Sequence, residues 1–143
     1  MDAMTPENTK KLLTDFPHLY RLYYKTVQES PMPWGFCCGD GWFEIIYELS
    51  QRIEACLKDE PKEIVDGFAV AQVKEKFGGL RYYVDGGTEK IEQLIREAEK
   101  KCMSTCEECG QPGKLRSGSW LLTLCDLCDV KRKKLWAIRY GLP

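Results

Sequence analysis

The chain has 143 residues, of which 43% are hydrophobic and 11% aromatic, enough for one core or a core plus a small finger. Its net charge is −1, with 13 Lys and Arg against 18 Asp and Glu in residues 1–100 and 8 against 4 in residues 101–143. This balance argues against a strong polyanion binder. The N-terminal residues form no apolar signal segment and no stretch is long enough to span a membrane, so we expect a protein of the reducing cytoplasm.

The N-terminal segment reads as helical. Residues 5–7, Thr-Pro-Glu, are typical of a helix start, because a hydroxyl residue caps, proline fits the first helical position and an acid follows in the first turn. After an interruption at Pro17, apolar residues at helical spacing from Leu19 to Val27 predict a second helix that ends near Ser30.

A loop rich in proline, glycine and large apolar residues follows at residues 31–39. Asp40 is placed to cap the next helix, which we expect to run from about Gly41 to Asp59 because its apolar residues share one wide face. Pro61 ends that helix.

A hairpin is predicted next. Residues 68–77 and 80–84 are both strand-like, and Gly78-Gly79 between them is a turn signal. Thr88 then caps a helix with a clear apolar stripe at i, i+3, i+4 and i+7, formed by Ile91, Leu94, Ile95, Ala98 and Cys102. We therefore predict an α+β domain over residues 1–101, with helices packed on a small antiparallel hairpin sheet.

Four cysteines carry the most specific pattern in the chain. Cys106 and Cys109, then Cys125 and Cys128, form two C-x2-C pairs with 15 residues between them. Two such pairs can close a tetrahedral Zn(Cys)4 site, and four ligands with no open position indicate one structural Zn²⁺. Gly110 follows the first pair, where a knuckle needs a residue free to adopt positive φ. We predict a four-cysteine, treble-clef-like zinc-finger domain over residues 102–143.

Support for catalysis is weak. The single histidine, His18, lies beside a proline and is interpreted as structural. No common nucleophile, phosphate-loop or metallohydrolase motif occurs. Asp40, Glu44 and Glu48 are spaced to share a helix face, which we interpret as a solvated acidic surface. A small hydrolase or nuclease would have to be built from Cys37, Cys38, Asp40 and Glu44.

Two segments are candidate contact surfaces. The predicted hairpin combines cations with aromatic residues around a glycine tip, a composition that suits phosphates and bases but also fits an ordinary solvated sheet, which we favour. The proline-rich loop exposes large apolar groups. The nominated side chains are Lys74, Lys76, Phe77 and Arg81 in the hairpin and Trp34 and Phe36 in the loop.

Three motifs together resemble a group of small zinc-finger proteins encoded by phages and prophages. These are Cys-Gly-Asp-Gly-Trp at 38–42, Val-Lys-Glu-Lys-Phe-Gly-Gly-Leu-Arg-Tyr-Tyr at 73–83, and Cys-x2-Cys-Gly with a closing Thr-Leu-Cys-x2-Cys at 106–128. The resemblance implies a phage setting, and with it the host-cell cytoplasm and a host protein as partner.

The finger alone is similar to GATA-type fingers, in which a strand ends in Leu-Cys-x2-Cys at the start of a helix. Basic residues follow the last cysteine pair here too, but the longer basic tail of those fingers is absent. We therefore expect a non-enzymatic adaptor or inhibitor that acts by contact with a host protein, for example one in defence or transcription. The alternative is a nucleic-acid-binding zinc-finger regulator, for which we expect at most weak, sequence-indifferent binding. The finger residues nominated for a partner or phosphate are Lys114, Arg116, Lys131 and Lys134.

Overall fold

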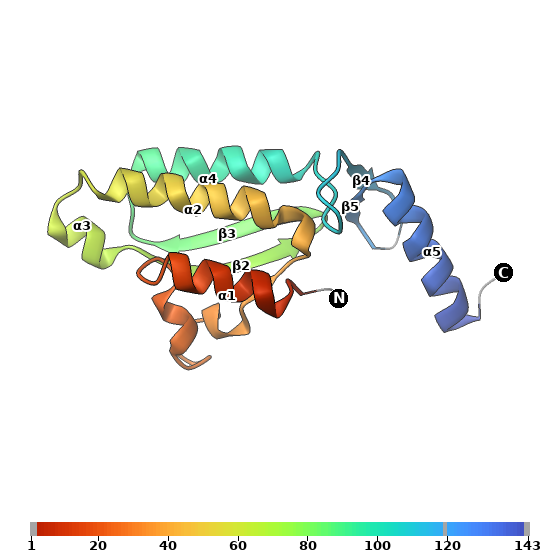
Figure 1. Ribbon diagram of the computed structural model, residues 1–143, viewed down its shortest axis with the longest axis horizontal. Coiled ribbons are helices and arrows are strands. Elements are labelled where there is room, and N and C mark those ends of the chain that lie inside the picture. Colours follow the sequence, from red (N-terminus) through yellow and green to blue (C-terminus); the bar gives the residue numbers. More distant parts are fainter. Residues whose placement is uncertain (1–2, 119, 142–143) are drawn as a thin grey trace.

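The chain combines helices with short strands in the computed structural model, which describes residues 3–118 and 120–141 (Figure 1). The α-helices are α1 (Pro6–Asp15), α2 (Phe43–Leu57), α3 (Lys62–Gly67), α4 (Glu89–Cys102) and α5 (Asp126–Tyr140). The short 3-10 helices are η1 (Arg21–Tyr24), η2 (Met32–Trp34) and η3 (Asp40–Trp42). The strands are β1 (Phe36–Cys37), β2 (Ala69–Lys76), β3 (Gly79–Asp85), β4 (Lys114–Arg116) and β5 (Leu122–Leu124).

The main sheet has the order β1-β2-β3, with β1 parallel and β3 antiparallel to β2. Helices α2 and α4 lie side by side along it, and the apolar stripe of α4 is buried as its spacing predicts (Figure 1). A second, two-stranded sheet, β4-β5, leads into α5. This mixture of helices and small sheets with a C-terminal cluster of four cysteines confirms the predicted α+β fold with a four-cysteine finger.

A buried hydroxyl chain fixes the core on the helix-covered side of the sheet. The hydroxyl of Tyr20 lies 2.6 Å from Ser50 Oγ on α2 and 2.8 Å from Tyr82 Oη on β3. Burial raises the pKa of Tyr20 to about 12, so the hydroxyl stays protonated at neutral pH. The chain therefore joins η1, α2 and β3 without leaving these hydroxyls unsatisfied.

Two helix predictions need correction. The segment from Leu19 to Ser30 forms only the short η1 and turns, because the Leu19 carbonyl accepts the Val70 N–H at 2.9 Å and so follows the strand β2. Helix α3, six residues long, is absent from the predicted elements, since fewer than two turns of helix have too few residues to show a period.

Asp40 caps a different helix from the one expected. Its Oδ1 accepts the Thr5 N–H at 2.9 Å and the Asn8 Nδ2 amide at 3.0 Å, so it ties down the N-terminus of α1. Among the described residues, no side chain caps α2. Thr5 and Thr88 do cap α1 and α4 as predicted, accepting from Asn8 N and Ile91 N.

The turn of the β2–β3 hairpin is Phe77-Gly78, one residue earlier than the predicted Gly78-Gly79. Lys76 pairs with Gly79, which leaves a two-residue turn with φ of 54° at Phe77 and 82° at Gly78. Two consecutive positive φ values are those of a type I′ turn, whose twist suits a hairpin.

The segment Cys38–Trp42 forms the main contact with the finger. Gly41 N donates to Glu107 O at 2.7 Å, Gly39 N to Glu107 Oε2 at 2.9 Å, and Trp42 Nε1 to Thr105 O at 2.8 Å. A Cβ atom at Gly41 would lie 2.1 Å from the Cys106 carbonyl oxygen, so only glycine permits this approach. We call these contacts the knuckle seam.

The seam generates a prediction. Gly41→Ala should destabilise the protein by about 2–3 kcal/mol, and so lower Tm by about 5–10 °C, because backbone atoms on both sides must move apart. Gly67→Ala is the matched control, since a Cβ there meets no described atom within 4 Å. Thermal unfolding followed by circular dichroism measures both, and equal Tm values for the two variants would contradict the seam.

Candidate metal centre

The four predicted ligands come together at the base of the finger. The Sγ atoms of Cys106, Cys109, Cys125 and Cys128 all lie within 4.8 Å of one another, close enough to hold a single metal ion. The first pair lies in a loop after α4, and the second pair lies at the start of α5. Between them, β4 and β5 form the hairpin that brings the two pairs together.

Local backbone geometry positions each pair. Gly110 has φ of 80° and its N–H donates to Cys106 O at 2.9 Å, which closes the knuckle. Cys125 is the N-cap residue of α5, and its Sγ accepts the Cys128 N–H at 3.4 Å. The sulfurs are therefore held by a tight turn on one side and by a helix start on the other.

The helix start also prepares a thiolate. The Cys128 N–H holds the pKa of Cys125 at about 7, below the ordinary value for a thiol. A thiolate is the form that binds a metal, whereas burial raises the pKa of Cys128, so metal binding by this cluster would release protons. The donor set fits a soft or borderline divalent ion, and four sulfur donors leave no position for a substrate.

An ion-pair cluster fixes α5 on its hairpin. Asp129, only 5% exposed, pairs with Arg132 at 2.9 Å, Lys133 at 3.1 Å and Arg116 at 3.7 Å. Arg116 also binds Asp126 and donates twice to the Leu124 carbonyl. Arg116 was nominated for a partner or phosphate; its guanidinium is instead committed inside the finger.

The other finger cations are free of this cluster. Lys114 on β4 and Lys131 and Lys134 on α5 are exposed. With Arg116 excluded, the finger offers three of its four nominated cations to a ligand.

The contact residues predicted in the α+β domain, here called the body, also differ in whether their side chains are exposed. Trp34 and Phe77 are 70% and 66% exposed, and Lys76 is exposed beside Phe77. Lys74 and Arg81 are half-buried on the sheet. Phe36, by contrast, is 2% exposed and packs edge-on against Tyr20, 5.0 Å between ring centroids, so it belongs to the core and corrects the prediction of a contact role.

The catalytic candidates have different surroundings in the structure. Cys38 is fully buried, and burial raises its pKa well above the ordinary value. Burial also raises the pKa of Cys37, although Lys74 opposes the shift. Asp40 binds the start of α1, as described above, while Glu44 faces a surface groove beside the knuckle.

His18 has structural partners. Its Nε2 lies 2.8 Å from the Val65 carbonyl, to which it can donate, and the Arg21 guanidinium lies beside the same ring. Arg21 in turn donates to the Phe68 carbonyl. The ring therefore fastens the Leu19 segment to α3, in agreement with its interpretation as structural.

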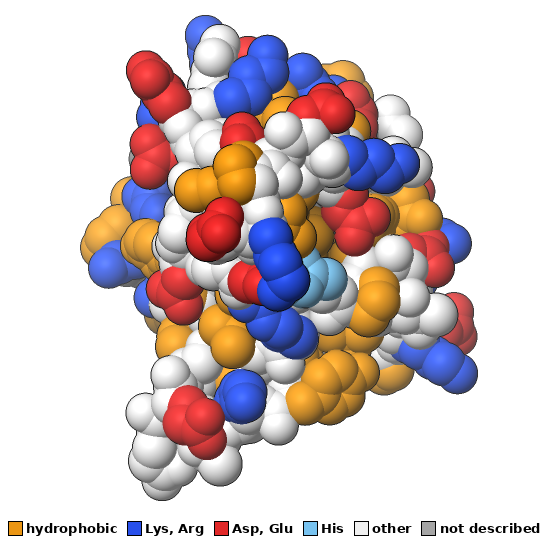
Figure 2. All heavy atoms as spheres, turned by 90° about the vertical axis from the view of Figure 1, so that its left-hand side faces the viewer, with side chains coloured by type: hydrophobic (Ala, Val, Ile, Leu, Met, Phe, Trp, Pro, Cys, Tyr) orange, Lys and Arg blue, Asp and Glu red, His pale blue; other side chains and the backbone are white. Residues whose placement is uncertain are grey.

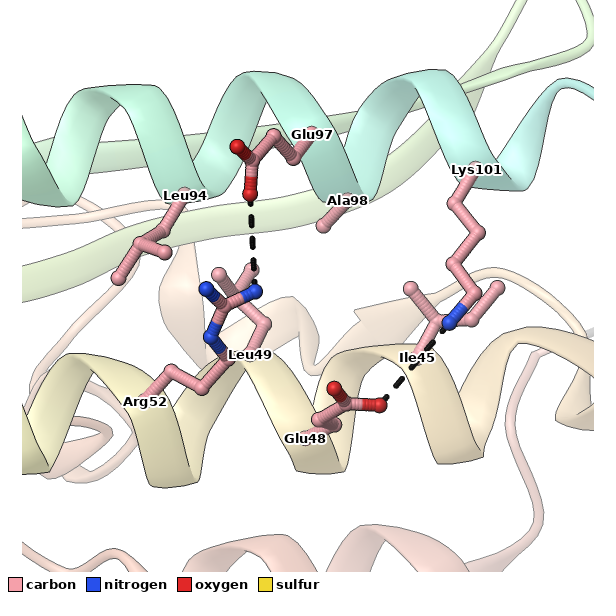
Figure 3. A pocket seen from close by; sticks show the side chains of 8 residues that line it. All are labelled: Ile45, Glu48, Leu49, Arg52, Leu94, Glu97, Ala98 and Lys101. Atoms are coloured by element: carbon pink, nitrogen blue, oxygen red, sulfur yellow. Dashed lines mark ion pairs between the residues drawn. The ribbon is translucent and has the colours of Figure 1, made fainter.

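A shallow surface groove lies where α2 and α4 pack against each other (Figure 3). Its floor is apolar, and two ion pairs bridge the helices, Arg52–Glu97 at 3.6 Å and Lys101–Glu48 at 4.0 Å. The polar groups thus pair with each other and do not converge on a common point. Both carboxylates of this groove are thus neutralised by a cation from the facing helix.

The end of the molecule that carries α3 has no charge of a single sign. Figure 2 shows acidic and basic side chains interspersed over that face, with apolar side chains between them. This distribution matches a solvated surface and does not resemble a polyanion site.

Comparison with protein-family models, with curated proteins and with solved structures finds no match to this chain. In the described residues, no helix is both long and apolar enough to cross a membrane. The metal centre is therefore the feature from which a function has to be argued.

Removing the metal should unfold the finger and lower the thermal stability of the body. Metal analysis is expected to give one ion per chain, lost on chelation or in Cys109→Ser. If the site contributes about 4 kcal/mol, Tm falls by about 8–16 °C for a chain of this size. Cys56→Ser, a half-buried cysteine on α2 outside the cluster, should keep both the metal and the Tm. A metal-free protein of unchanged Tm would contradict this expectation.

Proposed function

We propose that the protein is a non-enzymatic binding module in which Zn²⁺, held by the four cysteines, fixes a finger whose last helix makes contact with a partner protein. Tetrahedral zinc suits four thiolates and needs no further ligand. The ion would be structural: it would hold the knuckle to the start of α5, with no open position for chemistry.

The observation that carries the proposal is the surface of α5. Leu127 and Ile138 are 75% and 81% exposed, and Leu135 and Val130 are 65% and 48% exposed. Residues 127, 131, 134 and 138 follow the i, i+4, i+7, i+11 spacing of one helix face, with 130 and 135 beside it. Figure 1 shows that α5 extends away from the body. We call this surface the aliphatic face of α5.

The opposite side of α5 is already used within the finger. Trp136 packs edge-on against Trp120, 6.5 Å between ring centroids, and against Tyr140 at 5.8 Å. Asp129 and Arg132 form the ion pairs described above. The helix is thus anchored to the finger through Asp129, Arg132 and Trp136, while Tyr140 remains 61% exposed, and the aliphatic face takes part in none of these contacts.

The charges on this face indicate what kind of partner surface would be complementary to it. Lys131 and Lys134 are both exposed among the aliphatic residues, and the described residues of this face include no carboxylate. In a two-fold pairing of α5 helices, lysines would approach lysines, which disfavours a second copy of the chain. An apolar groove with an acidic rim is complementary, as in helix-in-groove recognition. The resemblance to phage-encoded proteins makes a host protein the class of partner.

Binding to this face can be tested with matched variants. The double variant Leu135→Glu and Ile138→Glu should bind its partner with an affinity lower by about a hundredfold or more, since each aliphatic side chain buried in the interface contributes about 1.5–3 kcal/mol. Its Tm should not change, because both side chains are exposed. Tyr24→Glu with Val27→Glu is the control, removing exposed apolar residues of the body, 73% and 51% exposed.

The measurement is affinity capture from cells that make the protein, quantified by mass spectrometry for the wild type and both variants. A protein captured by wild type and control, but lost with the α5 variant, is the expected result. Equal capture of the same protein by the wild type and the α5 variant would contradict the proposal. Sedimentation of the purified protein distinguishes a dimer through α5, which would also count against it.

A further inference from the structure

The main sheet has one covered and one open face. Leu80 and Tyr82 on β3, with Val73 on β2, are at most 3% exposed and point into the core with α2 and α4. Their neighbours point the other way, and Tyr83 among them is 46% exposed. Side chains alternate along a strand, so the second face of the sheet carries its own continuous set of residues.

Pairing identifies the residues of this open face. Gln72 pairs with Tyr83, Lys74 with Arg81 and Lys76 with Gly79, and Cys37 lies beside Lys74. The three cations take part in none of the ion pairs formed by the described residues. The first carboxylate along this face is Asp85, at the far end of β3. A cationic strip thus occurs in a part of the chain that is acidic overall.

The hairpin tip adds an aromatic ring. Phe77 is 66% exposed and has φ of 54°, a conformation that a non-glycine residue adopts only at a cost. Asparagine or glycine would satisfy the turn better. Lys76 Nζ lies 5.5 Å from the ring centroid.

The tip is also held rigidly. Thr123 Oγ1 donates to the Gly78 carbonyl at 2.6 Å, and the Glu75 carboxylate accepts the Gly78 N–H at 2.7 Å. The finger hairpin therefore supports the turn from one side, and β2 supports it from the other side. Phe77 is presented in a fixed position at the end of the open face.

We propose that this open face, from Tyr83 to Phe77, binds single-stranded nucleic acid. Lys74, Lys76 and Arg81 would neutralise phosphates, while Phe77 and Tyr83 would stack on bases. The strip is about 17 Å long at the rise of a β-strand, enough for a short segment of a single nucleic-acid strand. This site lies on the body, so it does not depend on the role proposed for α5.

A single strand fits better than the other polyanions. Exposed rings on a sheet need unstacked bases, and a duplex hides its bases inside the stack. An acidic peptide would use the cations but would leave the ring of Phe77 without a matching flat partner. Three cations predict modest affinity with a log–log salt slope of about −2.

The test uses the full-length, metal-loaded protein with fluorescein-labelled oligo-dT and oligo-rU of about 20 nucleotides, followed by anisotropy at low salt. Phe77→Asn should weaken binding about tenfold while Tm stays the same or rises, because asparagine suits positive φ. Tyr83→Ala should weaken binding similarly. Lys74→Gln with Arg81→Gln should make the salt slope shallower, from about −2 to about −0.7, because one phosphate contact remains.

Lys131→Gln with Lys134→Gln makes the same charge change on α5 and should leave the affinity for the oligonucleotides unchanged. A loss of affinity in this control as large as that in the sheet variant would overturn the proposal. So would the absence of binding at low salt, tighter binding of a duplex, or tighter binding of a poly-glutamate peptide. Phe77→Asn with unchanged affinity would also overturn it, since stacking at the tip is its central claim.

Discussion

The close backbone approach at the knuckle seam is the constraint on which the rest of the structure depends. Gly41 N donates to the Glu107 carbonyl, in the loop that carries the first cysteine pair, and the neighbouring Trp42 is fully buried in the body core. Core packing and knuckle conformation therefore fix each other. A metal ion that sets the positions of the cysteine sulfurs also sets the carbonyls on which the body rests. For this reason the metal centre supports more of the chain than the finger alone.

Both proposed surfaces follow from this arrangement. The seam and the Thr123–Gly78 hydrogen bond hold the finger at the end of the sheet, at the hairpin tip. Helices α2 and α4 cover one face of the sheet and leave the other open. The finger contacts its own helix through Asp129 and Trp136, so the remaining side of α5 faces solvent. The proposed structural ion would thus support both proposed contact surfaces, one aliphatic and one cationic and aromatic.

Local patterns were readable in the sequence, whereas long-range partners were not. The spacing within each C-x2-C pair, the caps at Thr5 and Thr88 and the stripe of α4 are local patterns, and the structure agrees with them. Asp40 serves a helix more than 30 residues away, which no local rule indicates. The glycines of the 38–42 motif were recognised as a pattern, but their reason, a carbonyl of the knuckle, appears only in three dimensions. Arg116 was nominated as a free cation because its partner Asp129 lies across the hairpin.

The strongest evidence for function lies where the chain departs from rules that it follows elsewhere. Helices α1 and α4 are capped, and the hydroxyls of the core are satisfied. Against this background, an aromatic residue at positive φ on an exposed turn and four exposed aliphatic residues on one helix contribute nothing visible to folding. A left-handed conformation at Phe77 costs about 1–2 kcal/mol, a cost that glycine would avoid. The next two residues, Gly78 and Gly79, are glycines, so this sequence uses glycine at the turn but not at position 77. Local conflicts without a structural benefit concentrate at sites selected for binding. Phe77 and the aliphatic face of α5 both show such a conflict, and they belong to different elements, so each proposed surface can be altered without disturbing the other.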